Sequence, residues 1–256
     1  MAKKNIFTDA FGTPYFLKRL VIFILGIVSY RRFNGFNKLK ITGTEHLVDL
    51  PDSNVLFVCN HQTYFADVAA MYHAFCAVNN GYLNTIKNPI YLLNPKIDFY
   101  YVAAEETMNK GILPKIFKIA GAVTVKRTWR AEGKNVNRMV DMSEVDNIMK
   151  ALDNGWVATF PQGTTSAFAQ GRRGTAKLVK NQRPIVIPIK TQYAQKYKTH
   201  AKTGLFQVPC GGLVHELVQK HHLNGTKKVK ITSTNNLHLR SAKSTSHPSL
   251  QKSEYY

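Results

Sequence analysis

The feature of this sequence that most restricts its fold is a set of short apolar runs, each of which ends in polar or charged residues. Four runs have this form: SNVLFVCNH (53–61), KIFKIAGAVTVKR (115–127), WVATFPQGTTS (156–166) and RPIVIPIK (183–190). Short continuous apolar runs are typical of strands buried on both faces of a sheet, and in KIFKIAGAVTVKR the strand is expected at the end of the run. A further strand is predicted upstream, in KLKITGTEHL.

Helical patterns separate these runs. Residues 66–79 have helical character, GRRGTAKLVKNQ fits a short helix, and SEVDNIMKALDNGW gathers apolar residues on one face. Ser143 is the expected N-cap of this last helix, and Gly155 is its expected stop. Strands that alternate with helices indicate an α/β fold, with a mixed and largely buried sheet flanked by helices.

The N-terminal segment, residues 1–37, combines an apolar run from Leu20 to Tyr30 with flanking cations. The run is about half of the roughly 20 residues that a membrane-spanning helix needs, and no signal-peptide cleavage site follows it. We expect a helix in the membrane interface; the alternative is a helix packed on the domain. At the interface, four cations would contact lipid headgroups: Lys18, Arg19, Arg31 and Arg32. Four aromatic rings would lie in the boundary region: Phe16, Phe23, Tyr30 and Phe33.

The character of the chain changes beyond residue 190. Residues 154–256 contain 16 Lys and Arg against two acidic residues, Glu216 and Glu254. We therefore divide the chain into the N-terminal segment, a domain at 38–190 and an atypical basic region at 191–256, whose end has the composition of a disordered tail. Within that region only KKVKITST has a strand pattern. The region is either a basic surface segment or an aberrant reading frame.

The formal net charge of +20 favours an anionic partner, such as a membrane face, a phosphorylated substrate or nucleic acid. No RNA-binding block or zinc-finger spacing accompanies the charge, so we expect no specific nucleic acid. We also expect no metal site, because no acidic or cysteine partner lies at ligand spacing from the C-terminal histidines, His200, His215, His221, His222 and His238. The cysteines share no CxxC spacing and are expected to be reduced, as in a cytosol-facing protein: Cys59, Cys76 and Cys210.

Polar groups follow three of the predicted strands, at the edge where α/β sheets collect ligands. Asn60, His61 and Asp67 follow the first, Lys126 and Arg127 end the second, and PQGTTS follows the third. An imidazole is well suited to remove a hydroxyl proton near pH 7, and a carboxylate bonded to its far nitrogen fixes the tautomer. The alternative is that Asp67 caps the next helix and His61 only ends its strand.

In this order and spacing, the blocks resemble the glycerolipid acyltransferase family, which includes bacterial 1-acyl-sn-glycerol-3-phosphate acyltransferase. NHQTYFAD resembles its catalytic block, GAVTVKR its second block, FPQGTTS its FPEGTRS block and IVIPI its last strand. The resemblance covers residues 55–190 and implies a glycerol-phosphate acyltransferase-like fold, His61 and Asp67 as catalytic residues, and no cofactor. It implies a set of substrate-binding residues: Lys126, Arg127, Gln162, Gly163, Thr164, Thr165, Arg172 and Arg173.

The reaction that the resemblance implies moves a fatty acyl group from acyl-ACP or acyl-CoA to the hydroxyl of a lysophospholipid. The first expected acceptor is 1-acyl-sn-glycerol-3-phosphate, in phospholipid biosynthesis. The expected partners are therefore the lysophospholipid, the acyl carrier protein or coenzyme A thioester, and a membrane surface. The expected location is the cytoplasmic face of the inner membrane, with peripheral or monotopic attachment.

Two departures from the family pattern leave the acceptor and the activity open. Five residues separate His61 from Asp67, instead of the four of HxxxxD, so QTYFA must form a loop for the pair to meet. Gln162 and Thr165 replace a Glu and an Arg of the family block. These changes favour an acceptor such as a lyso-aminolipid. The sequence is also compatible with a degenerate acyltransferase, or with a non-catalytic basic protein that binds membranes or nucleic acid.

Overall fold

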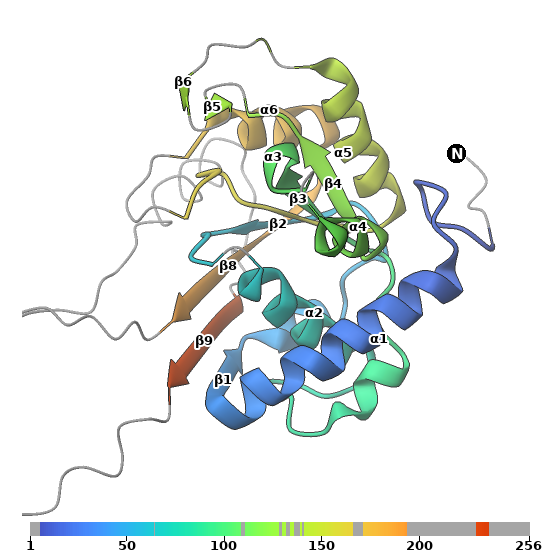
Figure 1. Cartoon of the computed structure of the whole chain (residues 1–256), viewed down its shortest axis with the longest axis vertical. Helices are drawn as coiled ribbons and strands as arrows, with labels where there is room; N and C mark the ends of the chain where they lie inside the picture. Colours follow the sequence, from blue (N-terminus) through green and yellow to red (C-terminus); the bar gives the residue numbers. More distant parts are fainter. Residues whose placement is uncertain are drawn as a thin grey trace, which may run out of the picture.

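The computed structural model describes residues 6–63, 65–108, 111–127, 130–131, 134–135, 139, 141–165, 171–193 and 229–235. Within these residues, a seven-stranded sheet of order β1-β9-β8-β2-β7-β3-β4 forms the centre of the fold (Figure 1). Its strands are β1 (Asn37–Thr42), β2 (Val55–Cys59), β3 (Phe99–Ala104), β4 (Ala122–Val125), β7 (Trp156–Thr159), β8 (Ile185–Tyr193) and β9 (Val229–Asn235). A separate short ribbon pairs β5 (Arg130–Ala131) with β6 (Lys134–Asn135).

The sheet is mixed, because β1 runs antiparallel to β9 and the other neighbouring pairs are parallel. The helices are α1 (Tyr15–Arg31), α2 (Ala66–Asn79), α3 (Glu105–Met108), α4 (Ile112–Ile119), α5 (Met142–Asn154) and α6 (Arg173–Gln182). Shorter helical segments are the π-helix η1 (Arg32–Phe36) and the 3₁₀ helices η2 (Thr44–Leu47) and η3 (Pro89–Leu93). The predicted fold class, an α/β domain with a mixed sheet and flanking helices, is confirmed.

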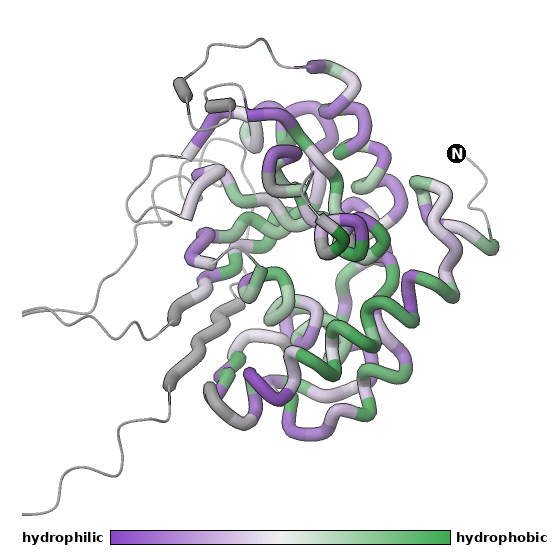
Figure 2. Tube along the Cα trace, viewed as in Figure 1, coloured by the Kyte–Doolittle hydropathy of each residue, from purple (hydrophilic) through white to green (hydrophobic). Residues whose placement is uncertain are grey.

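Strand β2 shows why this sheet is covered on both faces. All five of its residues are buried. Alternate side chains point to opposite faces: Val55, Phe57 and Cys59 join the core cluster that contains α2, whereas Leu56 and Val58 join the cluster that contains residues of α5 and α6. Figure 2 shows this hydrophobic centre and the more hydrophilic α5 at the periphery. A continuous apolar run is therefore required here.

Two local predictions were wrong, and one strand was missed. The run KLKITGTEHL is a strand only to Thr42; Gly43 then adopts φ 86°, and the short helix η2 follows. The N-cap of α5 is Asp141 instead of Ser143, because the Asp141 side chain accepts a hydrogen bond from the Ser143 backbone N–H. Strand β3 was not predicted, because its sequence FYYVAA lies in a stretch whose aromatic and polar residues show no clear period.

Helix α1 packs on the domain along one side. Ile22 and Gly26 are buried there, and a Cβ on Gly26 would lie 2.5 Å from a methyl carbon of Leu92 in η3. Lys18 is also buried: its Nζ lies 3.0 Å from Asp9 Oδ2 and 4.0 Å from the centre of the Tyr100 ring. Burial lowers the pKa of Lys18, and Asp9 partly opposes this effect. The expectation that Lys18 contacts headgroups is therefore wrong.

The opposite side of α1 is exposed and apolar. Phe16 and Val28 are 73% and 70% exposed, and Leu20 and Ile24 lie between them at a helical spacing. Phe33, which we expected at a membrane boundary, is instead buried. No helix among the described residues is long and apolar enough to cross a membrane. The N-terminal segment thus combines a packed side with an exposed apolar side.

Part of the C-terminal region belongs to the sheet. Strand β9, predicted within KKVKITST, lies between β8 and β1; Ile231 pairs with Thr191 on one side and Ile41 on the other. The predicted disordered tail and most of the basic region lie outside the described residues. The central sheet therefore includes a strand from beyond residue 190.

Candidate active site

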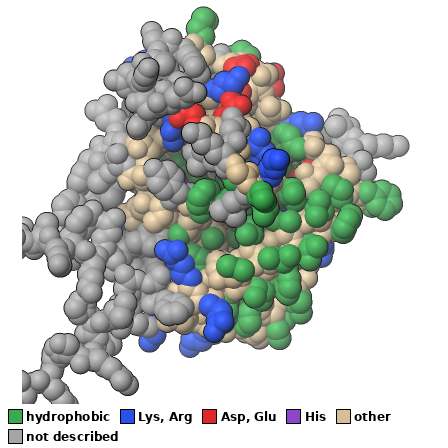
Figure 3. Space-filling model, in the orientation of Figure 1, with side chains coloured by type: hydrophobic (Ala, Val, Ile, Leu, Met, Phe, Trp, Pro, Cys, Tyr) green, Lys and Arg blue, Asp and Glu red, His purple; other side chains and the backbone are tan. Residues whose placement is uncertain are grey.

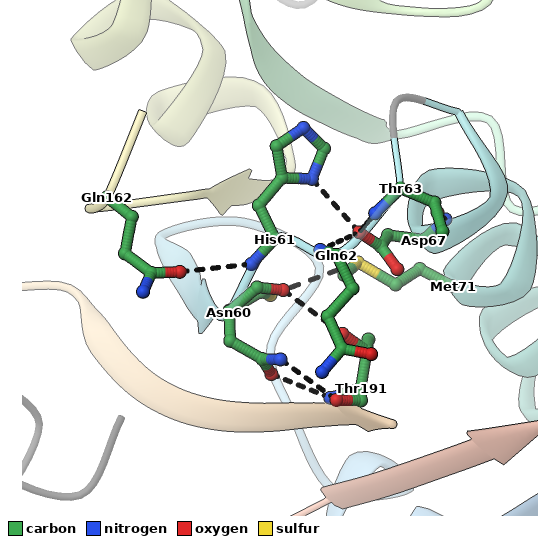
Figure 4. A network of polar contacts seen from close by, with 9 residues as sticks. Asn60, His61, Gln62, Thr63, Asp67, Met71, Gln162 and Thr191 are labelled. Carbon is green, nitrogen blue, oxygen red and sulfur yellow. Dashed lines mark hydrogen bonds and ion pairs between the residues drawn. The ribbon is translucent and has the colours of Figure 1, made fainter. Parts of the chain in front are cut away.

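The loop that follows β2 brings His61 to Asp67. The strand ends at Cys59 and helix α2 begins at Ala66, so the intervening chain is free of helical geometry. His61 Nδ1 lies 2.9 Å from Asp67 Oδ2 (Figure 4). The extra residue between the two, relative to HxxxxD, is accommodated in this loop. The expected contact is present.

Asp67 is fully buried, and its oxygen Oδ2 accepts more than one hydrogen bond. Besides the His61 ring, the backbone N–H groups of Gln62 (2.8 Å) and Thr63 (3.0 Å) donate to it. The Asp67 N–H in turn donates to Thr63 Oγ1 at 3.1 Å. The other oxygen, Oδ1, is buried and has no hydrogen-bond partner among the described residues. These contacts fix the carboxylate on the first turn of α2, where the helix dipole favours negative charge.

The pairing determines which nitrogen of His61 is available. A carboxylate only accepts hydrogen bonds, so Nδ1 carries the hydrogen, and in the neutral ring Nε2 is the nitrogen with the lone pair. Figure 4 shows Nε2 on the side of the ring away from Asp67. The His61 side chain is 16% exposed, and the Phe160 ring lies beside it, with ring centres 4.4 Å apart. Nε2 is thus the atom positioned to take a proton from a bound molecule.

The loop after β7 lies next to His61, because β7 is the neighbour of β2 in the sheet. Gln162 is buried, and its Oε1 accepts a hydrogen bond from the His61 backbone N–H at 3.4 Å. Gly163 has φ 61°, a conformation that glycine adopts readily, and its N–H donates to Phe160 O at 2.9 Å. Thr164 and Thr165 follow, both half-buried. The structure therefore brings this predicted block to the dyad.

Lys126 and Arg127 lie further away, at the end of β4. Three strand spacings separate β4 from β2, which amounts to roughly 14 Å. The Lys126 backbone N–H donates to the Glu144 carboxylate, and Arg127 Nη1 lies 3.4 Å from Glu106 Oε2. Arg127 Nε is buried and lacks a hydrogen-bond partner within the described part of the chain. The predicted cations therefore share the carboxyl edge of the sheet with the dyad but are not its immediate neighbours.

Arg172 and Arg173 have exposed side chains at the start of α6. The Arg172 backbone N–H donates to Pro161 O at 2.8 Å, which connects α6 to the loop that carries Gln162. This contact involves the main chain and keeps the start of α6 near this edge of the sheet. The role of the two guanidinium groups in binding substrate stays a prediction.

Two contacts of this site were not predicted. Asn60 binds Thr191 across the sheet, and Phe160 packs on the His61 ring. A distance of 131 residues along the chain separates Asn60 from Thr191, so no local pattern connects them. The position of Asn60 immediately before His61 was the available signal.

No cluster of three or more potential metal ligands occurs among the described residues. The five C-terminal histidines considered above lie outside these residues, as does Cys210. Cys59 and Cys76 are buried thiols, and burial raises the pKa of the Cys76 thiol to about 12. Both thiols therefore belong to the core.

A sequence model of the family described as Acyltransferase matches residues 38–192, which is more than half of the chain. A curated protein of Arabidopsis thaliana, named probable 1-acyl-sn-glycerol-3-phosphate acyltransferase 5, is 25% identical over 154 residues. That alignment covers 60% of this chain and 35% of the plant protein, so the chain spans about a third of the length of this relative. No solved structure matches the chain.

Proposed function

This chain belongs to the Acyltransferase family, and we propose that it is a membrane-associated enzyme that moves a fatty acyl group from acyl-ACP or acyl-CoA to the hydroxyl of a lysophospholipid. The observation that carries the proposal is the contact between His61 Nδ1 and Asp67 Oδ2, which leaves Nε2 on the other side of the ring. Such a pair can act as a general base on an alcohol.

In the proposed reaction, His61 Nε2 accepts the hydroxyl proton while the lysolipid oxygen attacks the thioester carbonyl carbon. The resulting imidazolium is stabilised by Asp67, whose carboxylate is already held by two backbone N–H groups. The tetrahedral intermediate then loses the thiolate, which takes the proton from His61 and leaves as a thiol. One C–S bond breaks, one C–O ester bond forms, and His61 returns to its neutral state.

The first proposed acceptor is 1-acyl-sn-glycerol-3-phosphate, the substrate in the name of the plant relative. Arg127 is the strongest candidate for the phosphate, because its fork of N–H donors suits phosphate oxygens and its Nε lacks a partner among the described residues. Lys126, Arg172 and Arg173 would add positive charge at the same edge. If the phosphate of the acceptor binds Arg127 after β4, the rest of the acceptor must extend to His61 after β2.

A second acceptor class, a lyso-aminolipid, is favoured by one observation. The loop nearest to His61 presents Gln162 and Thr165, both uncharged, where the family pattern has a Glu and an Arg. A headgroup without a phosphate beside the reacting hydroxyl would not need a cation at position 165. The reaction type is the same for both acceptors.

The test is an acyl-transfer assay with purified protein, using acyl-CoA and acyl-ACP as donors and the two lysolipids as acceptors. We expect one acceptor to be acylated and His61→Ala to abolish the transfer. If neither acceptor is acylated by either donor, or if His61→Ala transfers at the wild-type rate, the proposal is wrong.

The proposed attachment to the cytoplasmic face of the inner membrane uses the exposed apolar side of α1. Figure 3 shows hydrophobic side chains gathered over this helix. Ile90 and Leu93 of η3 and Ile112 of α4 are exposed on elements that contact α1. An apolar surface flanked by cations such as Arg19 and Arg31 suits a bilayer with anionic lipids.

Vesicle flotation tests the attachment. We expect Leu20→Ser with Ile24→Ser to reduce binding to anionic vesicles strongly, because both side chains lie on the exposed side of α1. Met142→Ser is the matched control: Met142 is 62% exposed, but it belongs to α5 on the other face of the sheet. Equal binding by the double variant and the wild type would exclude attachment through α1.

A further inference from the structure

Immediately before His61, the Asn60 side chain forms a reciprocal pair with the backbone of Thr191. Asn60 Nδ2 donates to Thr191 O, and the Thr191 N–H donates to Asn60 Oδ1, both at 2.8 Å. Thr191 Oγ1 donates to the Asn60 carbonyl oxygen at 3.1 Å. Both residues are 1% exposed. Figure 4 shows this pair directly below His61.

The carboxamide of Asn60 takes the place of the next peptide group of β2. The parallel ladder between β2 and β8 runs from Val55 with Ile185 to Cys59 with Ile189. Two residues beyond Ile189, β8 presents the N–H and C=O of Thr191 to the end of β2. A carboxamide offers the same donor and acceptor as a peptide. Buried main-chain groups left without partners are costly, so this replacement allows the main chain of β2 to end here.

The end of β2 at this residue is what allows His61 to face Asp67. In a continued strand, position 61 would stay in the ladder beside β8, instead of starting the loop to α2. The His61 main chain is held on one side by the Asn60 pair and on the other by Gln162 Oε1. The ring is then held by Asp67. Asn60 is the member of this set that terminates the strand.

We propose that Asn60, through its pair with Thr191, is a positioning residue for His61 in acyl transfer. The inference rests on the proposed function, since it assigns Asn60 a role in the same reaction. Asn60 acts by fixing the main chain from which the imidazole extends. Loss of the pair lets the ring move relative to Asp67 and the acceptor, and displacements of about 1 Å can cost about 10²-fold in rate.

A purely structural role predicts a different result, and the chain contains a matched control. Asn84 Oδ1 accepts hydrogen bonds from the Thr44 N–H and Oγ1, both at 3.1 Å, and the Asn84 N–H donates to Thr44 Oγ1 at 2.7 Å. This second Asn–Thr pair connects η2 to the loop before η3. Its removal eliminates the same kind of contact without touching the loop of His61.

The experiment compares Asn60→Ala with Asn84→Ala in the full chain. We expect the kcat of Asn60→Ala to fall about 100-fold with little change in the acceptor KM, and the pH dependence of kcat to shift because the His61 contact with Asp67 is weakened. Asn84→Ala should lower the melting temperature while its kcat and pH profile stay at wild-type values. Equal kcat values per folded protein for the two variants would overturn the inference.

A second pair of variants keeps the test open if Asn60→Ala does not fold. Thr191→Val removes the hydroxyl that binds the Asn60 carbonyl and retains the volume and the backbone partners, so a smaller fall in kcat is expected. Thr191→Ser restores the hydroxyl and should recover the rate. If Thr191→Val and Thr191→Ser both have the wild-type kcat, Asn60 is not held in place through this contact and the inference fails.

Imidazole NMR separates the failure of this inference from failure of the proposed function. If the wild type acylates no lysolipid, the proposed function is wrong, but the His61 ring resonances can still be measured. Asn60→Ala should change the Nδ1–H signal of His61, and Asn84→Ala should leave it in place. An unchanged signal in Asn60→Ala would overturn the positioning role whatever the activity.

Discussion

Two histidines near the same helix show how the environment decides between chemistry and packing. His61 contacts Asp67 at the start of α2, and His73 lies within that helix, six residues after Asp67. His73 is buried between Ser29 of α1, 2.9 Å from Nε2, and Tyr91 of η3, 2.8 Å from Nδ1. Burial lowers its pKa to about 4. Within the described part of the chain, His61 has a hydrogen-bond partner on one ring nitrogen, whereas His73 has partners on both.

The hydrogen-bond roles around His73 follow from its neighbours. Ser29 Oγ donates its hydrogen to Leu25 O at 2.7 Å, so it accepts from His73 Nε2–H. Nδ1 then accepts from the Tyr91 hydroxyl. With both nitrogens engaged and no carboxylate in contact among the described residues, this ring connects α1, α2 and η3. A Ser beside a His is therefore not sufficient evidence for a nucleophile.

Replacement of each imidazole in turn tests whether the two histidines differ in this way. We expect His61→Ala to reduce kcat about 10³- to 10⁴-fold, because it removes the proposed general base, with little loss of stability at a partly exposed side chain. His73→Ala should destabilise the fold and leave the kcat of the folded protein close to wild type. Acyl-transfer kinetics and thermal melts on both variants measure this; equal losses of kcat would remove the distinction between the two rings.

Asp67→Asn tests the role of the carboxylate that contacts His61. We expect a fall in kcat of about 10²- to 10³-fold, since an uncharged amide cannot stabilise the imidazolium that forms when His61 takes the proton. The backbone N–H groups of Gln62 and Thr63 can still bind the Asn oxygen, so the melting temperature should change little. Wild-type kinetics for this variant would show that the carboxylate has no role in the reaction.

The acid stability of the protein should depend on His73. The pKa is about 4 in the folded state and 6.5 for the ordinary group, so the unfolded chain binds more protons between these values. Stability is retained above pH 6.5 and falls as the pH drops towards 4, by about 3 kcal/mol at 1.36 kcal/mol per pKa unit. Denaturant melts at several pH values, with His73→Ala as the comparison, measure the difference; identical pH profiles would contradict it.

The smallest expected effect concerns Gln162. Its Oε1 accepts the His61 N–H at 3.4 Å, a long bond worth about 1 kcal/mol or less. Gln162→Ala should lower kcat about five-fold, and Gln162→Glu, which keeps an oxygen acceptor, should retain most of the activity. The comparison is made at constant donor and acceptor concentrations. A larger loss in the Glu variant than in the Ala variant would mean that charge, and not the bond, matters at this position.

The sequence predicted the strands that are buried on both faces, because their continuous apolar runs leave little choice. β2 and β8 agree closely with their predicted runs, and α2 begins and ends at the predicted residues. β7 covers only the start of its run, Trp156–Thr159, and the start of KIFKIAGAVTVKR belongs to helix α4 while its end forms β4. β3 was missed, because the tyrosines of FYYVAA fit a strand, a helix or a loop equally well until the two faces of the sheet are known. Burial of alternate residues resolves that choice only in three dimensions.

For the candidate site, the sequence predicted the residues better than their arrangement. The meeting of His61 and Asp67 required a loop, which the structure contains. The separation between Arg127 and the dyad depends on strand order, and the order β2-β7-β3-β4 is not the order along the chain. Lys18 was placed wrongly for a related reason: its partners Asp9 and Tyr100 become neighbours only when α1 packs on the domain.

Because β9 lies between β1 and β8, the described sheet can be completed only late in translation. Asn37 of β1 pairs with Asn235 of β9, and Ile189 of β8 pairs with Val229 of β9. Neither β1 nor β8 can form these pairs until β9 has been translated. Until then, the nascent chain exposes two strand edges with unpaired main-chain groups, which attract other chains. Chaperone binding during synthesis should therefore matter more for this protein than for one whose sheet closes early.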